Sequence, residues 1–169
     1  MTIHPLLESD LNDVVRIEQD SYSAPWTRKM FVDELEGNPF ASLFVCREAE
    51  IIVGHVCYWV IFEELHILNL AVSSSHRRRR FASALMTHTI TNACAHGAHS
   101  AMLEVRASNI PATTFYTQIG FQQIALRAQY YSNPVEDAII MRCALVTTAH
   151  ADRISPTVNT SRPEETISG

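Results

Sequence analysis

Lysine is almost absent from this chain of 169 residues: Lys29 is the only one, and arginine supplies the other basic side chains. The formal net charge is −5, from 13 basic and 18 acidic residues. General nucleic-acid binding favours a basic surface, so this charge balance argues against it. We therefore expect no direct nucleic-acid partner.

Long apolar runs are missing as well. The chain contains no stretch of about 18 apolar residues, the length that a membrane-spanning helix needs. Residues 1–10 lack the basic start and the apolar run of a signal peptide. We expect a cytoplasmic protein with no membrane partner.

The four cysteines form no disulfide framework, which fits a reducing compartment. Three of them lie in largely apolar runs and are expected to be buried thiols: Cys46, Cys57 and Cys143. Cys94, His96 and His99 have a spacing found in metal sites, but no fourth ligand is evident. We expect no metal.

Length and composition suit one globular domain, because 47% of the residues are hydrophobic and 18% are charged. The composition changes near the C-terminus, where Ser, Thr, Pro, Glu and Asn dominate and large apolar side chains are few. Such a segment cannot bury enough surface to offset its ordering entropy. We expect a folded domain over residues 1–147 and a disordered tail over 148–169.

Hydrophobic periodicity predicts an order of elements ααβββαβαββ. The predicted helices span residues 10–22, 27–35, about 80–96 and 111–119. The predicted strands span residues 41–47, 51–62, 65–72, 101–106, 122–129 and 137–146, with 2–7 as a candidate further strand. Ser9 or Asp10 is the expected cap of the first helix. The strand–helix–strand unit around residues 80–96 predicts an α/β fold with a mixed sheet.

After the strand that ends at Val72, the sequence predicts a polar turn and then a helix. Residues 76–82, at this junction, read HRRRRFA. A helix N-terminus offers unpaired N–H groups and the positive end of its dipole, which suit a pyrophosphate. The arginines would add forked donors for phosphate oxygens. A solvated basic cluster or a nucleic-acid patch is the alternative interpretation.

Three later segments form a much more specific pattern. They read LEVRASN at 103–109, FYTQIGF at 115–121 and EDAIIM at 136–141. Together with IEQ at 17–19 and APW at 24–26, they resemble the GNAT superfamily of N-acetyltransferases. The resemblance is specifically to the RimI family, which acetylates the N-terminal alanine of a small-subunit ribosomal protein. It covers about residues 3–145.

The resemblance implies the GNAT (acyl-CoA N-acyltransferase) fold: a mixed, mostly antiparallel, twisted sheet that is splayed near its middle and flanked by about four helices. It implies acetyl-CoA as the acetyl donor and the N-terminus of a ribosomal protein as the acceptor. We expect direct transfer in a ternary complex, and a monomer or weak dimer.

The resemblance also implies roles for individual residues. Glu104 matches the general base, and Tyr116 matches the residue that protonates the leaving thiolate. The residues that match the cofactor-binding strand, loop and following position are Leu70, Ala71, Val72, Arg77, Arg78, Arg79, Arg80, Phe81, Ala82, Ser83 and Asn109, together with Tyr116. Without the resemblance, Glu104 could be an ordinary strand carboxylate and Tyr116 a core aromatic beside Phe115 and Phe121.

The chain departs from the superfamily loop Gln/Arg-x-x-Gly-x-Gly/Ala at one position. Arg77 and Ala82 fit the loop, but Arg80 stands where glycine lets the backbone approach the phosphates. We expect helical φ and ψ at Arg80, which do not require glycine, so that the helix start still donates its N–H groups. The substitution also motivates one alternative, a non-catalytic CoA-binding module.

An N-terminal acceptor suits a carboxylate base. A protein α-amine has a pKa of about 7.7–8.0, whereas a lysine side chain has one of about 10.4, so the α-amine is far more often neutral at pH 7. Glu104 would take the amine proton through a water, and N–H groups along residues 70–72, freed by a bulge, would meet the oxyanion. Acetylation of other N-termini, of lysines or of small amines is the alternative within the enzyme class.

Five further residues have open roles. The aromatic residues either line the peptide side of the cleft or pack in the core or at the rim: Trp26, Tyr130 and Tyr131. Glu136 and Asp137 either attract the positive N-terminus of the acceptor or cap a turn.

Overall fold

The structure is a computed structural model that describes residues 1–145, so the predicted tail over 148–169 lies outside the described residues. The strands are β1 (Thr2–Pro5), β2 (Ala41–Glu48), β3 (Ile51–Ile61), β4 (Glu64–Val72), β5 (Ser100–Arg106), β6 (Gln122–Ser132) and β7 (Val135–Ala144). The α-helices are α1 (Leu11–Ser21), α2 (Arg28–Gly37), α3 (Phe81–Ala95) and α4 (Ile110–Gln118), and two short 3₁₀ turns lie at Glu8–Asp10 and Ser74–His76. The predicted order of elements is confirmed, including the candidate strand at the N-terminus.

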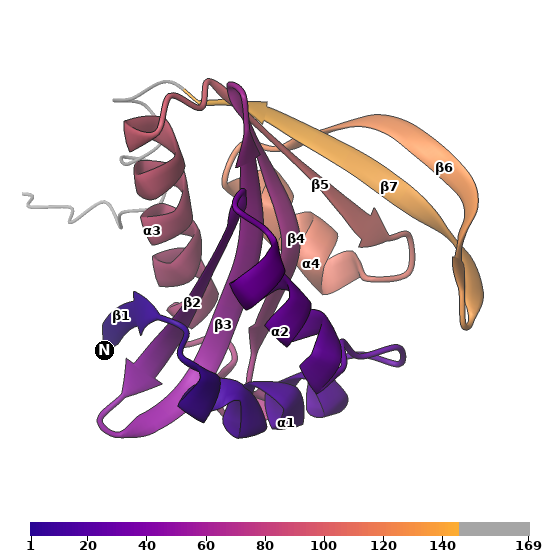
Figure 1. The fold of residues 1–169 in the computed structure, drawn as a ribbon. Coiled ribbons are helices and arrows are strands. Elements are labelled where there is room, and N and C mark those ends of the chain that lie inside the picture. The colour runs from indigo at the N-terminus through magenta and orange to yellow at the C-terminus, as the bar shows by residue number, and fades with distance from the viewer. Residues whose placement is uncertain (146–169) are drawn as a thin grey trace, which may run out of the picture.

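All seven strands belong to one sheet with the order β1-β2-β3-β4-β5-β7-β6 (Figure 1). Every neighbouring pair is antiparallel except β4 and β5, which are parallel. The parallel pair follows from the crossover through α3, since strands joined by a helix run in the same direction. The predicted mixed, mostly antiparallel sheet with four flanking helices is therefore confirmed.

The helices cover both faces of the sheet, and each face has its own apolar cluster (Figure 1). On one face, α1 buries Leu11 and Val14 at helical spacing against Phe31 of α2. On the other face, α3 contributes Leu85 and Met86, which are fully buried. Each such side chain stabilises the fold by about 1.5–3 kcal/mol on burial. No helix within residues 1–145 has the length and apolar character to cross a membrane.

The two central strands pair over only part of their length. The parallel ladder runs from Glu64–Ser100 to Ile67–Leu103 and then stops, although β4 continues to Val72. The pairing of β4 with β3 also changes register here, leaving Leu68 as an extra residue. A bulge of this kind bends its strand away from a neighbour. The strands part beyond this point, as expected from the family resemblance, and the following residues of β4 lack a partner on the β5 side.

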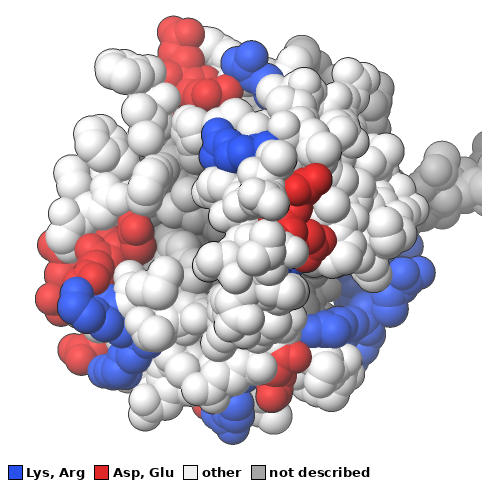
Figure 2. Space-filling model, turned by 90° about the vertical axis from the view of Figure 1, so that its right-hand side faces the viewer, with Lys and Arg blue, Asp and Glu red and all other residues white. Residues whose placement is uncertain are grey.

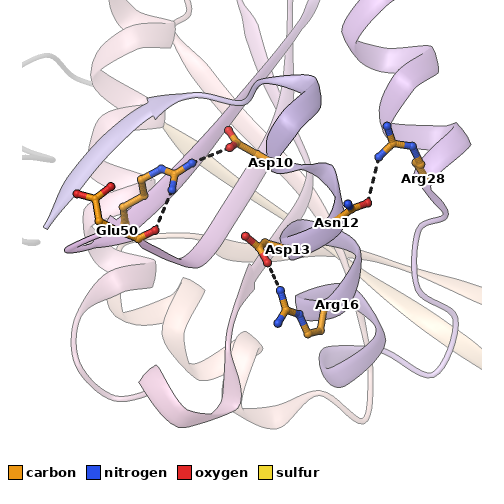
Figure 3. A network of polar contacts seen from close by, with 7 residues as sticks. Asp10, Asn12, Asp13, Arg16, Arg28 and Glu50 are labelled. Atoms are coloured by element: carbon orange, nitrogen blue, oxygen red, sulfur yellow. Dashed lines mark hydrogen bonds and ion pairs between the residues drawn. The ribbon is translucent and has the colours of Figure 1, made fainter.

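A network of polar contacts fastens the N-terminal segment to β2 (Figure 3). The Arg47 guanidinium lies 2.6 Å from Asp10 Oδ1 and donates to the carbonyl of Glu50 at 3.0 Å. The other oxygen of Asp10 accepts from the backbone N–H of Leu7 at 3.1 Å. Asp10 occupies the N-cap position of α1, as one of the two predictions had it, but its side chain makes no capping bond to the helix. Ser9 lies in the preceding 3₁₀ turn. The carboxylate of Asp10 binds partners outside the helix instead.

Gly54 of β3 lets the backbone of β4 approach closely. A Cβ atom added there would lie 2.8 Å from the carbonyl oxygen of Ala71 and 3.3 Å from Leu85. We expect Gly54→Ala to lower the free energy of unfolding by about 1–3 kcal/mol, because the backbone of β4 must move to make room. Urea denaturation measures this loss. Gly37→Ala is the control, since nothing lies within 4 Å of the added atom, and equal losses in both variants would contradict the assigned role.

Candidate active site

A cleft opens where β4 and β5 part. Figure 2 views the molecule from the side on which β6 and β7 lie in Figure 1; this face is hollowed near its middle, and side chains of both charge signs surround the hollow. The strands β4, β5 and β6, the helices α1 and α4 and the loop after α1 all contribute to the lining of the cleft. Its polar lining residues include Glu18, Tyr22, Asn69, Glu104, Tyr116 and Tyr131. The structure thus brings the two predicted catalytic residues to one cleft.

Glu104 lies on β5 immediately beyond the last residue that pairs with β4. Its side chain is partly exposed, and Oε1 accepts a hydrogen bond from Arg127 at 2.7 Å. A hydrogen bond with Glu104 is also the main reason why the pKa of Tyr130 lies above its ordinary value. Glu104 is therefore a cleft carboxylate with polar partners, and its role as a base stays a prediction.

Tyr116 both packs in the core, as an ordinary aromatic would, and lines the cleft, as a catalytic acid would. It belongs to α4 and is 8% exposed. The centroid of its ring lies 5.3 Å from that of Phe115 and 5.7 Å from that of Phe121. It also lines the cleft. Burial raises the pKa of its phenol far above the ordinary value, so the group keeps its proton at neutral pH. A protonated phenol on the cleft wall can donate a hydrogen bond or a proton.

Asn109 begins α4 and places Tyr116. Its side-chain oxygen accepts from the backbone N–H of Ala112 at 3.2 Å, and Pro111 occupies the first turn. Asn109 and Ala112 also line the cleft. The structure therefore gives Asn109 a capping role, while its contact with a cofactor stays a prediction.

The loop before α3 has an unusual backbone. Arg78 and Arg80 have φ values of 63° and 67°, in the left-handed region, and Arg80 is the N-cap of α3. The prediction of helical φ and ψ at Arg80 is therefore wrong. The chain needs the left-handed turn to enter the helix, which is the conformation that glycine adopts without cost. Arginine holds this conformation here under steric strain.

Two of the four arginines use their side chains elsewhere. Arg77 donates to the carbonyl of Val72 at 3.2 Å and to Ser21 at 3.3 Å. Arg79 lies 2.6 Å from Glu48 and stacks on the ring of Phe81. The expectation that all four guanidinium groups are available to phosphate is therefore not met in this structure.

The other residues predicted to bind the cofactor around the start of α3 differ in solvent exposure. Arg78 and Arg80 are exposed, whereas the side chain of Phe81 is buried in the core. Ala82 and Ser83 are half-buried at the start of α3. Any contact of Phe81 with a cofactor would therefore have to come from its backbone.

The strain at Arg80 is measurable. We expect Arg80→Gly to be more stable than Arg80→Ala by about 1–2 kcal/mol, because only alanine retains a Cβ in the left-handed conformation. Both variants lose the same guanidinium, so the difference isolates the backbone. Thermal or urea denaturation of the two variants gives the comparison. Equal stability would mean that Arg80 carries no strain.

Three polar residues of the cleft were not predicted as site residues. Tyr22, at the end of α1, donates a hydrogen bond to the carbonyl of Leu70 at 2.6 Å, which holds this end of the helix against β4. The Oδ1 atom of Asn69 is buried without a hydrogen-bond partner. Glu18, which is fully buried, accepts from the backbone N–H of Trp26 at 2.8 Å. Trp26 lines the cleft and also packs against Phe31, and its contact with a peptide stays a prediction.

The acidic pair near β7 stabilises backbone turns. Glu136 binds Arg106 at 3.2 Å, and hydrogen bonds from Ser108 hold the pKa of Glu136 below its ordinary value. Asp137 accepts from the backbone N–H of Gln129 at 2.8 Å. The turn-stabilising interpretation is therefore confirmed for both residues.

Cysteines and histidines contribute no metal centre that the structure reveals. Cys46, Cys57 and Cys143 are buried, as predicted. Over residues 1–145, no group of three or more His, Cys, Asp or Glu side chains is arranged to hold a metal ion.

A mixed sheet that parts over a cleft, with a helix N-terminus following the first parted strand, defines the class of acyl-CoA N-acyltransferases. The chain belongs to the Acetyltransferase (GNAT) family, whose family model matches residues 11–121. It is therefore an acyltransferase with the fold of that family.

Similar proteins include two that carry the name of ribosomal protein alanine N-acetyltransferases. The ribosomal protein bS18-alanine N-acetyltransferase of Haemophilus ducreyi is 32% identical over 142 residues, which cover 82% of this chain and 97% of that protein. The crystal structure of the ribosomal-protein-S18-alanine N-acetyltransferase from Escherichia coli has a TM-score of 0.77 and 31% identity, covering 85% of this chain and 93% of that one. The structure of Ard1 from Thermoplasma volcanium has a TM-score of 0.79 and 29% identity, covering 86% and 97% of the two chains.

Proposed function

We propose that the protein is an acetyl-CoA-dependent N-α-acetyltransferase of the bacterial cytoplasm that acetylates the N-terminal alanine of ribosomal protein bS18. The observation that carries the proposal is that Glu104 and the protonated phenol of Tyr116 line one cleft at the parting of β4 and β5. The shared name of relatives at 31% and 32% identity supports the choice of acceptor.

The residues around the cleft fit acetyl-CoA. Leu70, Ala71 and Val72 lie beyond the last pair of the β4–β5 ladder, so their backbone is available to an acetyl and pantetheine chain between the strands. The N-terminus of α3 follows, and the left-handed residues Arg78 and Arg80 turn the loop into it. Successive backbone N–H groups in such a turn form a concave anion site, which suits a pyrophosphate.

The proposed reaction is direct transfer. The acceptor α-amine attacks the thioester carbonyl in its neutral form, and Glu104 accepts, through a water, the proton that the nitrogen loses on attack. A carbon–nitrogen bond forms, and backbone N–H groups of residues 70–72 stabilise the resulting oxyanion. The carbon–sulfur bond then breaks, and Tyr116 donates its proton to the leaving thiolate of CoA.

A peptide panel tests this function. The purified protein is incubated with acetyl-CoA and peptides that carry the bS18 N-terminal sequence, the same sequence with a blocked α-amine, or a lysine as the only free amine. We expect mass spectrometry to find one added acetyl group on the free N-terminal alanine alone. Acetylation of the lysine peptide at the same rate would overturn the acceptor assignment, and binding of acetyl-CoA without product would indicate a non-catalytic module.

A further inference from the structure

Arg127 of β6 reaches the candidate base across an intervening strand. In register, Arg127 faces Ala138 of β7, which in turn faces Arg106 of β5. Glu104 lies two residues before Arg106 on the same face of the sheet, and its Oε1 is 2.7 Å from Arg127 Nη1. The guanidinium therefore spans β7, where the small side chain of Ala138 leaves it room.

A distortion of β6 adds Tyr130 to this pair. The strand pairing jumps from Arg127–Ala138 to Tyr131–Glu136, which leaves extra residues in β6, and Gln129 has a φ of 52°. The hydrogen bond from the Gln129 N–H to Asp137 fixes the distorted turn. A bulge of this kind redirects side chains, and here the Tyr130 ring lies against the Arg127 guanidinium.

The three side chains contact one another pairwise. The Arg127 guanidinium lies 4.9 Å from the centroid of the Tyr130 ring. Glu104 accepts from Arg127, and its carboxylate raises the pKa of the Tyr130 phenol. Each partner therefore restricts the rotamers of the other two. An ion pair as exposed as this one contributes little to folding stability, so its geometry matters more for the orientation of the carboxylate than for the fold.

We propose that Arg127 and Tyr130 are positioning residues that hold the Glu104 carboxylate in the orientation needed to receive the proton of the acceptor amine. This inference rests on the proposed function. A displacement of about 1 Å in a catalytic group can cost roughly 10²-fold in rate, so the loss of a partner should be visible in turnover. The second carboxylate oxygen is not used by Arg127, and it is the atom assigned to the water that relays the proton.

The same sheet provides a matched control. Arg142 of β7 lies 3.0 Å from Glu64 of β4, and the two side chains are 52% and 28% exposed. The corresponding values for Arg127 and Glu104 are 51% and 26%. Neither Arg142 nor Glu64 lines the cleft. Arg142→Met therefore removes an ion pair of nearly the same exposure at a distance from the chemistry.

Steady-state kinetics with an accepted peptide tests the inference. We expect Arg127→Met to lower kcat by about 10–100-fold, with the KM for acetyl-CoA changed by less than about two-fold. Arg127→Lys should recover part of the loss, because it restores a cation beside the carboxylate. Tyr130→Phe should lower kcat by several-fold, and Arg142→Met should leave it unchanged. An unchanged kcat in Arg127→Met would overturn the proposal.

A double-variant cycle separates positioning from direct contact with the substrate. If Arg127 acts only through Glu104, the variant Glu104→Gln/Arg127→Met should be no slower than Glu104→Gln alone. A further ten-fold loss in the double variant would overturn the positioning role. A rise in the peptide KM alone, with kcat preserved, would do the same, since it would identify Arg127 as a peptide contact.

A spectroscopic readout tests the network without turnover. The difference between the ultraviolet pH titrations of the wild-type protein and of Tyr130→Phe isolates the Tyr130 phenol. Its pKa should fall in Glu104→Gln, which weakens the main interaction that raises it, and should rise in Arg127→Met. An unchanged pKa of Tyr130 in Glu104→Gln would show that the two side chains do not interact and would overturn the proposal. A wild-type protein that acetylates no peptide would instead overturn the proposed function.

Discussion

Glu104→Gln should lower the turnover number of acetyl transfer by about 10²–10³-fold, since a positioned general base contributes roughly 10²–10⁴-fold to rate. Glutamine has nearly the same shape and can still accept from Arg127, but it cannot take the proton of the acceptor amine. The KM for acetyl-CoA should change little, because the carboxylate acts on the acceptor. Single-turnover kinetics with acetyl-CoA and an alanine-starting peptide measures the effect.

Tyr116→Phe is the companion variant for the acid step. It removes only the hydroxyl from a ring that packs between Phe115 and Phe121, so the fold should be kept. Glu64→Gln is the control for charge, since Glu64 is a half-buried carboxylate of β4 with its own arginine partner and does not line the cleft. Full turnover in both Glu104→Gln and Tyr116→Phe would rule out the catalytic roles assigned here.

Local patterns predicted the elements well because each pattern depends on near neighbours in the chain. Apolar residues at helical spacing and strand-forming runs located the helices and strands, and the family motifs pointed to the parting of β4 and β5. A bulge in this strand was expected, but no local signal placed it at Leu68, where the parting begins. It arises because β4 must pair with β3 on one side and separate from β5 on the other.

The errors in prediction share a physical cause. Asp10 has the residue type of a helix cap, yet its carboxylate is engaged by Leu7 and by the distant Arg47. Arg80 was expected to be helical, because its residue type alone gives no reason to adopt a left-handed turn. In both positions a tertiary requirement overrides local preference. Sequence reasoning sees the preference but not the competing partner.

Glu18 is the cleft residue that the sequence could have indicated. It lies seven residues after Leu11 and four after Val14, so it belongs to the apolar face of α1 despite its charge. A carboxylate on such a face predicts a buried polar partner. The partner, His55, lies far along the chain on β3 and could not be named from that spacing.

Glu18 connects three elements behind the acceptor side of the cleft. Its side chain and that of His55 are both fully buried, and Glu18 Oε1 lies 3.1 Å from His55 Nε2. Its other oxygen accepts from the backbone N–H of Trp26 at 2.8 Å. The ring of Phe31 packs against both Trp26 and His55. The carboxylate therefore holds the loop after α1 against β3.

Glu18→Ala should lower the free energy of unfolding by about 3–5 kcal/mol, since removing one partner of a buried pair leaves the other unpaired in a site that water cannot reach. It also leaves the Trp26 N–H without its acceptor. Urea denaturation measures the loss. Glu18→Gln should lose less, because an amide oxygen can still accept from Trp26. Glu8→Ala removes an exposed ion pair with Arg28 and should cost less than about 1 kcal/mol. A loss in Glu18→Ala no larger than that in Glu8→Ala would mean that the fold tolerates an unpaired His55 and that the loop is held by apolar contacts alone.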